Sequence, residues 1–137
     1  MMLKVIGGFL FLLHLFLLGW SVGGMTEWLL PSVPWPSYSN PLFPRWLLFF
    51  HWMSVITASS IILLGYLRQW NGTPRAMVFG YAAMAMVCFV ETVWFLAGEF
   101  KYLAMILENA AYIAILLVLH NPTFRSAHFS KTPARDH

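Results

Sequence analysis

Long apolar stretches alternate with short polar segments along the chain, and four of the stretches have the length of a membrane-spanning helix. They cover residues 4–22, 46–67, 76–97 and 101–120. Each holds about 20 residues, which cross about 30 Å of hydrocarbon at a rise of about 1.5 Å per residue. The stretches are apolar on every side, as lipid requires, so periodicity does not sharpen their ends. The pattern predicts an all-α integral membrane protein, a four-transmembrane-helix bundle in a single domain of residues 1–120.

The connection between the first two stretches, residues 23–45, is rich in proline and tryptophan. Its five prolines exclude a continuous helix, and Trp28 and Trp35 favour the headgroup layer. We expect a cap on the membrane surface, with a short helix near residues 26–30.

The remaining connections are short and polar. Residues 69–75 and 98–100 form tight turns, and the second of these makes the last two helices an antiparallel hairpin. Asn121-Pro122 ends the last helix, and residues 121–137 are predicted to be a loose polar tail.

The composition identifies the solvent of this protein as a bilayer. Hydrophobic residues make up 60% of the chain and charged residues only 9%, whereas an ordinary soluble domain is about half apolar and about one-quarter charged. The mean hydropathy is +0.70. Aromatic residues at 18% and a single cysteine, Cys88, argue against a disordered chain, a nucleic-acid-binding protein and a disulfide scaffold.

Basic residues are unevenly divided between the two ends of the predicted helices. Six lie on the side of the N-terminus and two on the other side; the six are Lys4, Arg68, Arg75, Arg125, Lys131 and Arg135, and the two are Arg45 and Lys101. The positive-inside rule therefore predicts that both termini are cytoplasmic and that the Pro/Trp-rich loop is non-cytoplasmic. The sequence does not indicate which membrane holds the protein.

The first apolar stretch also has features of a signal peptide. Lys4 precedes the apolar core and the small residues Gly23-Gly24 follow it. Cleavage would leave three helices with the same orientation, so the charge distribution does not choose between an anchor and a cleaved signal.

Two carboxylates stand inside the apolar stretches. Glu91 lies about eight residues before the last turn and Glu108 about eight residues after it, so the hairpin places both roughly 12 Å below its end. A charged side chain at this depth costs about 3 kcal/mol or more. The presence of two such carboxylates therefore indicates that they have a function. If the two face each other, repulsion and desolvation favour a shared proton, with hydrogen bonds to each other or to Asn109.

Further polar and aromatic residues are expected near these carboxylates. His51 lies about four residues inside the second helix, His14 is near the middle of the first, and Tyr112 lies one turn after Glu108. We expect one pocket in the outer half of the bundle, walled by Trp94 or Trp52 and gathering His14, His51, Glu91, Glu108, Asn109 and Tyr112.

The leading hypothesis for this pocket is a site for a lipophilic ligand that enters from the bilayer. As an enzyme it would perform acid–base chemistry of the isomerase or cyclase type on a hydrophobic substrate. In that form Glu91 is the proton donor, Glu108 is its base, and His51 exchanges protons with the outside.

Other hypotheses use the same residues differently. The main alternative is a non-catalytic accessory subunit of a larger membrane complex, since Ala110-x-x-x-Ala114 permits close helix contact. A small proton-coupled transporter is a further possibility. A metal or haem site has the necessary Glu and His residues but lacks His-x-x-His, Glu-x-x-His and Cys-x-x-Cys spacing, so no metal is predicted and the sequence names no cofactor. The structural alternative is that the polar residues only hydrogen-bond the helices together.

Overall fold

The computed structural model describes residues 2–30 and 44–130, and the regular structure there is helical. Four helices are long and apolar enough to cross a membrane, which confirms the predicted all-α four-helix fold. The elements are α1 (Met2–Leu29), α2 (Arg45–Arg68), α3 (Thr73–Val90), the π-helical turn η1 (Glu91–Phe95), α4 (Lys101–His120) and α5 (Pro122–His128).

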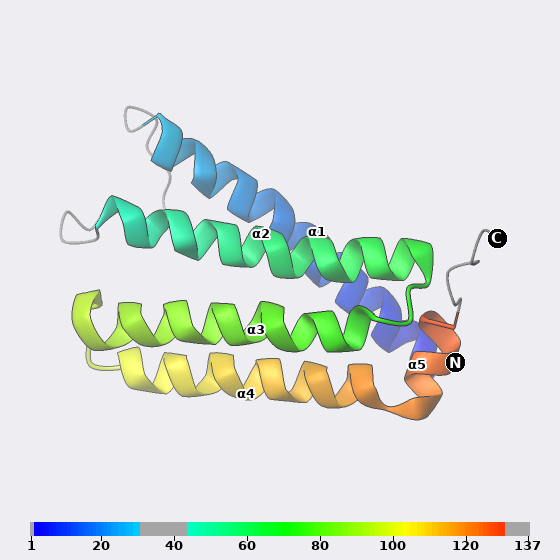
Figure 1. Ribbon diagram of the computed structural model, residues 1–137. Helices are drawn as coiled ribbons and strands as arrows, with labels where there is room; N and C mark the ends of the chain where they lie inside the picture. Colours follow the sequence, from blue (N-terminus) through cyan, green and yellow to red (C-terminus); the bar gives the residue numbers. More distant parts are fainter. Residues whose placement is uncertain (1, 31–43, 131–137) are drawn as a thin grey trace.

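The helices α2, α3 and α4 run antiparallel side by side, and α1 crosses them at an angle (Figure 1). We call the end of the bundle with Leu29, Arg45, Phe95 and Lys101 the loop end, and the end with α5 the terminus end. α1 packs mainly on α2, and α4 packs mainly on α3. Toward the loop end, α1 points away from α4 in Figure 1, so these two helices do not close on each other there.

Close packing of α2 on α3 fixes the centre of the bundle. Gly80 of α3 faces Ala58 of α2, and a Cβ atom added to Gly80 would lie 3.3 Å from the Ala58 Cβ. Both residues are buried, so the two backbones approach as small residues in membrane helices allow. The aromatic and aliphatic core surrounds this contact and continues to the terminus end, with Val55, Ile62, Met77, Tyr81, Leu119 and Phe124 among its members.

The first helix is longer than the sequence predicted. The expected short helix near residues 26–30 is the continuation of α1, which runs through Gly23 and Gly24 to Leu29. Gly24 lies against the indole of Trp52, where any larger side chain would overlap it, so packing on α2 compensates for the low helix propensity of glycine. Most of the Pro/Trp-rich loop, including Trp35, lies outside the described residues.

The segment after α4 is helical at its start, whereas the sequence predicted a loose tail. Pro122–His128 form α5, because the Asn121 side chain accepts hydrogen bonds from the backbone N–H groups of Thr123 and Phe124 and Pro122 occupies the first turn. Asn121-Pro122 therefore ends α4 and also starts α5. Phe124 and Phe129 are buried, so this segment contributes to the core as far as Phe129.

Candidate functional site

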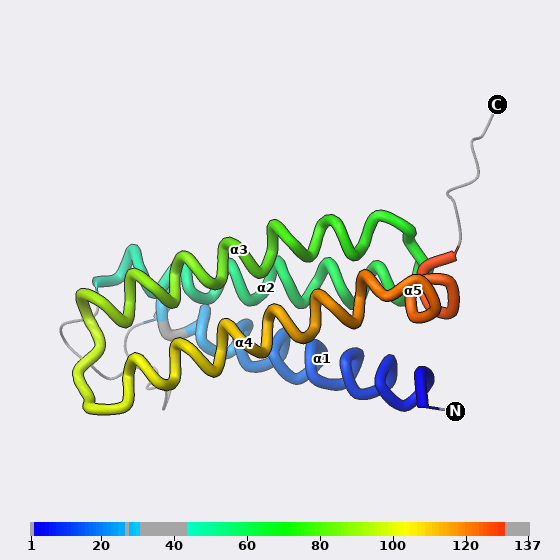
Figure 2. The backbone as a smooth tube through the Cα atoms, turned by 90° about the horizontal axis from the view of Figure 1, so that it is seen from below, coloured from blue at the N-terminus to red at the C-terminus, as the bar shows by residue number. Residues whose placement is uncertain are grey.

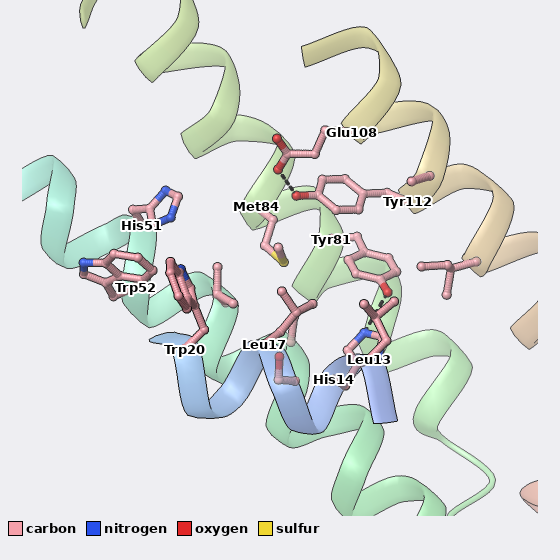
Figure 3. Close-up of a pocket in the computed structure, with 15 residues that line it drawn as sticks. Leu13, His14, Leu17, Trp20, His51, Trp52, Tyr81, Met84, Glu108 and Tyr112 are labelled. Carbon is pink, nitrogen blue, oxygen red and sulfur yellow. Dashed lines mark hydrogen bonds between the residues drawn. The ribbon is translucent and has the colours of Figure 1, made fainter. Parts of the chain in front are cut away.

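A cavity of about 450 Å³ is lined by residues from all four long helices (Figure 3). Its wall is mostly apolar and aromatic, and its volume falls in the range of small-molecule sites, about 300–1,000 Å³. It lies where α1 and α4 face each other without close packing. The wall consists of Leu13, His14, Leu17 and Trp20 of α1, His51, Trp52, Val55, Ala58 and Ser59 of α2, Tyr81 and Met84 of α3, and Glu108, Ala111, Tyr112 and Ile115 of α4.

Glu108 places a carboxylate on the cavity wall. One of its oxygens accepts a hydrogen bond from the hydroxyl of Tyr112, one turn later on α4 (Figure 3). The other accepts from the Cys88 thiol of α3 at 3.4 Å. Tyr112 is buried, whereas Glu108 is exposed at the protein surface. The carboxylate is thus held by two donors while it remains open to a ligand.

Glu91 and His51 form a second polar pair beside the cavity. The distance between His51 Nδ1 and Glu91 Oε1 is 2.8 Å, and Glu91 is only 4% exposed. Glu91 also begins the π-helical turn, because its carbonyl accepts from Leu96 N, five residues later, at 2.8 Å. Such turns occur frequently at functional sites. His51 lies on the cavity wall and Glu91 lies behind it, so the imidazole connects the buried carboxylate to the cavity.

A third polar pair lies deeper in the bundle, between α1 and α3. His14 Nδ1 bonds the carbonyl of Leu10 at 2.8 Å, and His14 Nε2 lies 2.9 Å from the Tyr81 hydroxyl. A carbonyl only accepts, so Nδ1 carries the proton and, in the neutral ring, Nε2 accepts from Tyr81. The rings of Tyr81 and Tyr112 stack with centroids 4.8 Å apart. This stack joins the deep pair to Glu108 at the loop end.

The two carboxylates meet in one crevice, as their equal distances from the turn predicted, but they take different partners. The crevice is also lined by His51, Cys88 and Tyr112. Glu91 pairs with His51 and Glu108 with Tyr112 and Cys88, rather than with each other.

The structure brings most of the predicted site residues to the cavity. His14, His51, Trp52, Glu108 and Tyr112 lie on its wall, and Glu91 lies directly behind it. Asn109 is not on the wall, and its amide donates to the carbonyl of Met105. Trp94 is 64% exposed and packs edge to face on Phe89. It lies inside the π-helical turn, and it is not on the cavity wall.

Three of the polar and aromatic wall residues, Trp20, Ser59 and Tyr81, were not predicted from the sequence. Tyr81 precedes Met84 by three positions on the same face of α3, and Trp20 follows Leu17 by three positions on α1, so helical spacing could have indicated both. Ser59 of α2 also lines the wall. It is 1% exposed, and its hydroxyl has no hydrogen-bond partner among the described residues.

Comparison with known proteins finds no matching family model, no matching curated protein and no matching solved structure. Within residues 2–30 and 44–130, no group of three or more His, Cys, Asp or Glu side chains is arranged to hold a metal ion. The function must therefore be inferred from the geometry of the cavity and its polar pairs.

Proposed function

We propose that this chain binds a lipophilic small molecule in the cavity shared by its four long helices. The observation that carries the proposal is an apolar space of about 450 Å³ with a carboxylate, Glu108, on its wall. A carboxylate that served only to join helices would be costly at this depth, since a hydroxyl or amide could do the same with less desolvation. A ligand with a polar end would bind the Glu108 carboxylate and so account for its position on the wall.

The route of entry follows from the helix packing. α1 packs mainly on α2 and α4 mainly on α3, so a lipophile enters from the bilayer between α1 and α4. Trp20 of α1 and Ala111 of α4 are exposed and also line the cavity, so they lie along this route. The polar end of the ligand then meets Glu108, and its apolar part lies along residues such as Leu17 and Ile115.

In its enzymatic form, the site performs acid–base chemistry on the bound lipophile. His51 is on the wall and is bonded to Glu91 at 2.8 Å, so this pair supplies a proton to the ligand. Glu108 is the base that takes a proton from a neighbouring carbon, which leaves the total number of protons unchanged in an isomerisation. Relative to the sequence hypothesis, His51 delivers the proton in place of Glu91 itself.

The test is to purify the protein from native membranes and identify retained molecules by mass spectrometry. We expect a stoichiometric lipophile with the wild-type chain, and its loss in both Glu108→Gln and Glu91→Gln at unchanged expression. Glu108→Gln has the larger effect because only Glu108 lies on the wall. If both variants retain the same molecules as the wild type, the carboxylates have no role in binding.

A second candidate function, an accessory subunit of a membrane complex, is favoured by one observation. α4 is the least covered of the long helices, with only Tyr112 and Leu119 buried. Ala110 and Ala114 are exposed and one turn apart, so a partner helix can approach closely there. In this case Ala110→Phe removes a partner chain from the purified complex, whereas Ala111→Phe, on the cavity wall, removes the small molecule.

We also propose that the terminus end faces the cytoplasm. Lys4, Arg68, Arg75 and Arg125 lie at this end, against Arg45 and Lys101 at the loop end. In a Cys88→Ala background, Glu99→Cys should react with an impermeant maleimide added to intact cells and Ser126→Cys should not. The opposite labelling pattern contradicts this orientation.

α1 supplies four wall residues, so we propose that it is not removed as a signal peptide. The intact mass of the purified protein should therefore include the first helix.

A further inference from the structure

Ser59 is a buried serine whose hydroxyl, unlike those of three nearby serine and threonine residues, bonds no carbonyl of its own helix. Ser21, Ser54 and Thr57 each donate to a backbone carbonyl of their own helix, at 3.0, 2.8 and 2.7 Å. Ser59 is as deeply buried as any of them, yet its hydroxyl has no partner among the described residues. A buried hydroxyl without a hydrogen-bond partner destabilises the protein. Because Ser59 lines the cavity, a bound ligand can supply the missing partner.

Ser59 and the polar residues of the loop end occupy two separate positions along the same cavity. His51 and Ser59 are eight residues apart on α2, which corresponds to about 12 Å along the helix axis. The wall between them carries the apolar residues Val55 and Ala58. A molecule that reaches both positions is therefore elongated, with an apolar middle.

The chemistry at the loop end selects the kind of group that binds there. An ionised Glu108 only accepts hydrogen bonds, so its partner must be a donor. No lysine or arginine is among the described residues of the wall to neutralise the carboxylate. Trp20 and Trp52 lie on the same wall, and aromatic rings favour a cation. These features favour an ammonium group over a neutral hydroxyl.

We propose that the ligand is a lipophilic amine with a second polar group, its ammonium held at Glu108 and its far hydroxyl or carbonyl bonded to Ser59. This inference rests on the proposed binding function and adds the chemical class and the orientation of the ligand. The Ser59 contact is a hydrogen bond that the apoprotein lacks, so it contributes to affinity without contributing to the stability of the empty protein.

The experiment measures binding of three probes to the purified full-length chain in nanodiscs, by the shift of its thermal unfolding. The probes are dodecylamine, dodecanol and the ω-amino alcohol of the same chain length. We expect the amino alcohol to bind about two- to tenfold more tightly than dodecylamine, as one added hydrogen bond predicts. Ser59→Ala should remove this advantage, and Glu108→Gln should remove the preference for dodecylamine over dodecanol.

Two matched variants separate this inference from the proposed function. Ser21→Ala removes a buried serine that is not on the wall, so it should leave the advantage of the amino alcohol intact. Ser59→Ala should not lower the unfolding temperature of the empty protein, whereas Ser21→Ala should lower it slightly.

The outcomes are distinct. If the amine and the amino alcohol bind the wild type equally, and Ala111→Phe abolishes both, the cavity binds lipophiles but the Ser59 contact is wrong. An advantage of the amino alcohol that survives in Ser59→Ala also overturns the inference. If no probe shifts unfolding of the wild type, or if Ala111→Phe leaves every shift unchanged, the proposed function fails as well.

Discussion

The two ends of the bundle are built differently. At the terminus end, α5 lies across the helix ends (Figure 2), and Phe124 and Phe129 are buried beneath it. The His128 ring lies 3.2 Å from the Leu3 carbonyl, so α5 also holds α1 in place there. Toward the loop end α1 and α4 diverge (Figure 1), and the cavity lined by the four long helices carries one carboxylate, Glu108, on its wall.

The comparison shows how a small membrane protein can keep an open site. Large apolar side chains such as Phe124 and Phe129 are buried at the terminus end and stabilise the fold. One buried acid, Glu91, lies toward the loop end, and the unsatisfied Ser59 hydroxyl lies near the middle of the bundle. α1 is held by α5 at the terminus end and by α2 at the loop end, where Arg45 Nη2 donates to the Trp28 carbonyl at 2.6 Å and Gly24 lies on Trp52. It does not pack closely on α4, and this is the side on which we propose that a ligand enters. The predictions below test this division between a stabilising end and a binding end.

The largest effect on stability is expected at the terminus end. Phe124→Ala removes a side chain that is 1% exposed and should lower the free energy of unfolding by about 3–5 kcal/mol. Phe100→Ala at the loop end, where the side chain is 73% exposed, serves as the control and should have little effect. Denaturant unfolding of both variants in the same detergent measures the difference. Equal losses would contradict the proposed division.

An intermediate effect is expected where α1 touches the cavity wall. A side chain at position 24 overlaps the indole of Trp52, so Gly24→Ala should cost about 1–3 kcal/mol and displace this wall residue. Gly19 on the same helix has open space around it, and Gly19→Ala should be neutral or stabilise by up to about 1 kcal/mol. Tryptophan fluorescence and thermal unfolding report the two consequences. Identical behaviour of the two variants would contradict the packing of α1 on Trp52.

Part of this site could be predicted from the sequence and part could not. The equal spacing of Glu91 and Glu108 from the turn predicted their common depth, because an antiparallel hairpin fixes depth, but that they line one crevice also depends on the rotation of the two helices. Their partners depend on helix rotation and on contacts between distant segments, such as Tyr81 with His14. Neither is encoded in the spacing along one helix.

The π-helical turn and the short helix α5 were also not predicted from the sequence. Trp94 lies in the π-helical turn at Glu91–Phe95 and is exposed, and this turn has no composition signal that separates it from an α-helix. By contrast, Asn121-Pro122 does carry a helix-start signal, so the prediction of a loose tail failed because only its helix-ending role was considered.

The smallest effect is expected at the middle of the bundle. Tyr81→Phe removes the hydroxyl that bonds His14 but keeps the ring stacked on Tyr112, so it should cost about 0.6 kcal/mol. Tyr102→Phe, at an exposed position of α4, is the control and should change nothing. Thermal unfolding of the two variants measures the difference, and a loss of several kcal/mol in Tyr81→Phe would show that this pair, rather than the terminus end, holds the fold together.

The most direct test of a ligand site between α1 and α4 is photocrosslinking in native membranes with an alkyl amine that carries a diazirine. We predict adducts on Leu13, Leu17, Ala111 or Ile115 that excess dodecylamine suppresses, and that disappear in Ala111→Phe but persist in Ala110→Phe. Adducts confined to bilayer-facing residues such as Phe79, and unaffected by the competitor, would contradict the account.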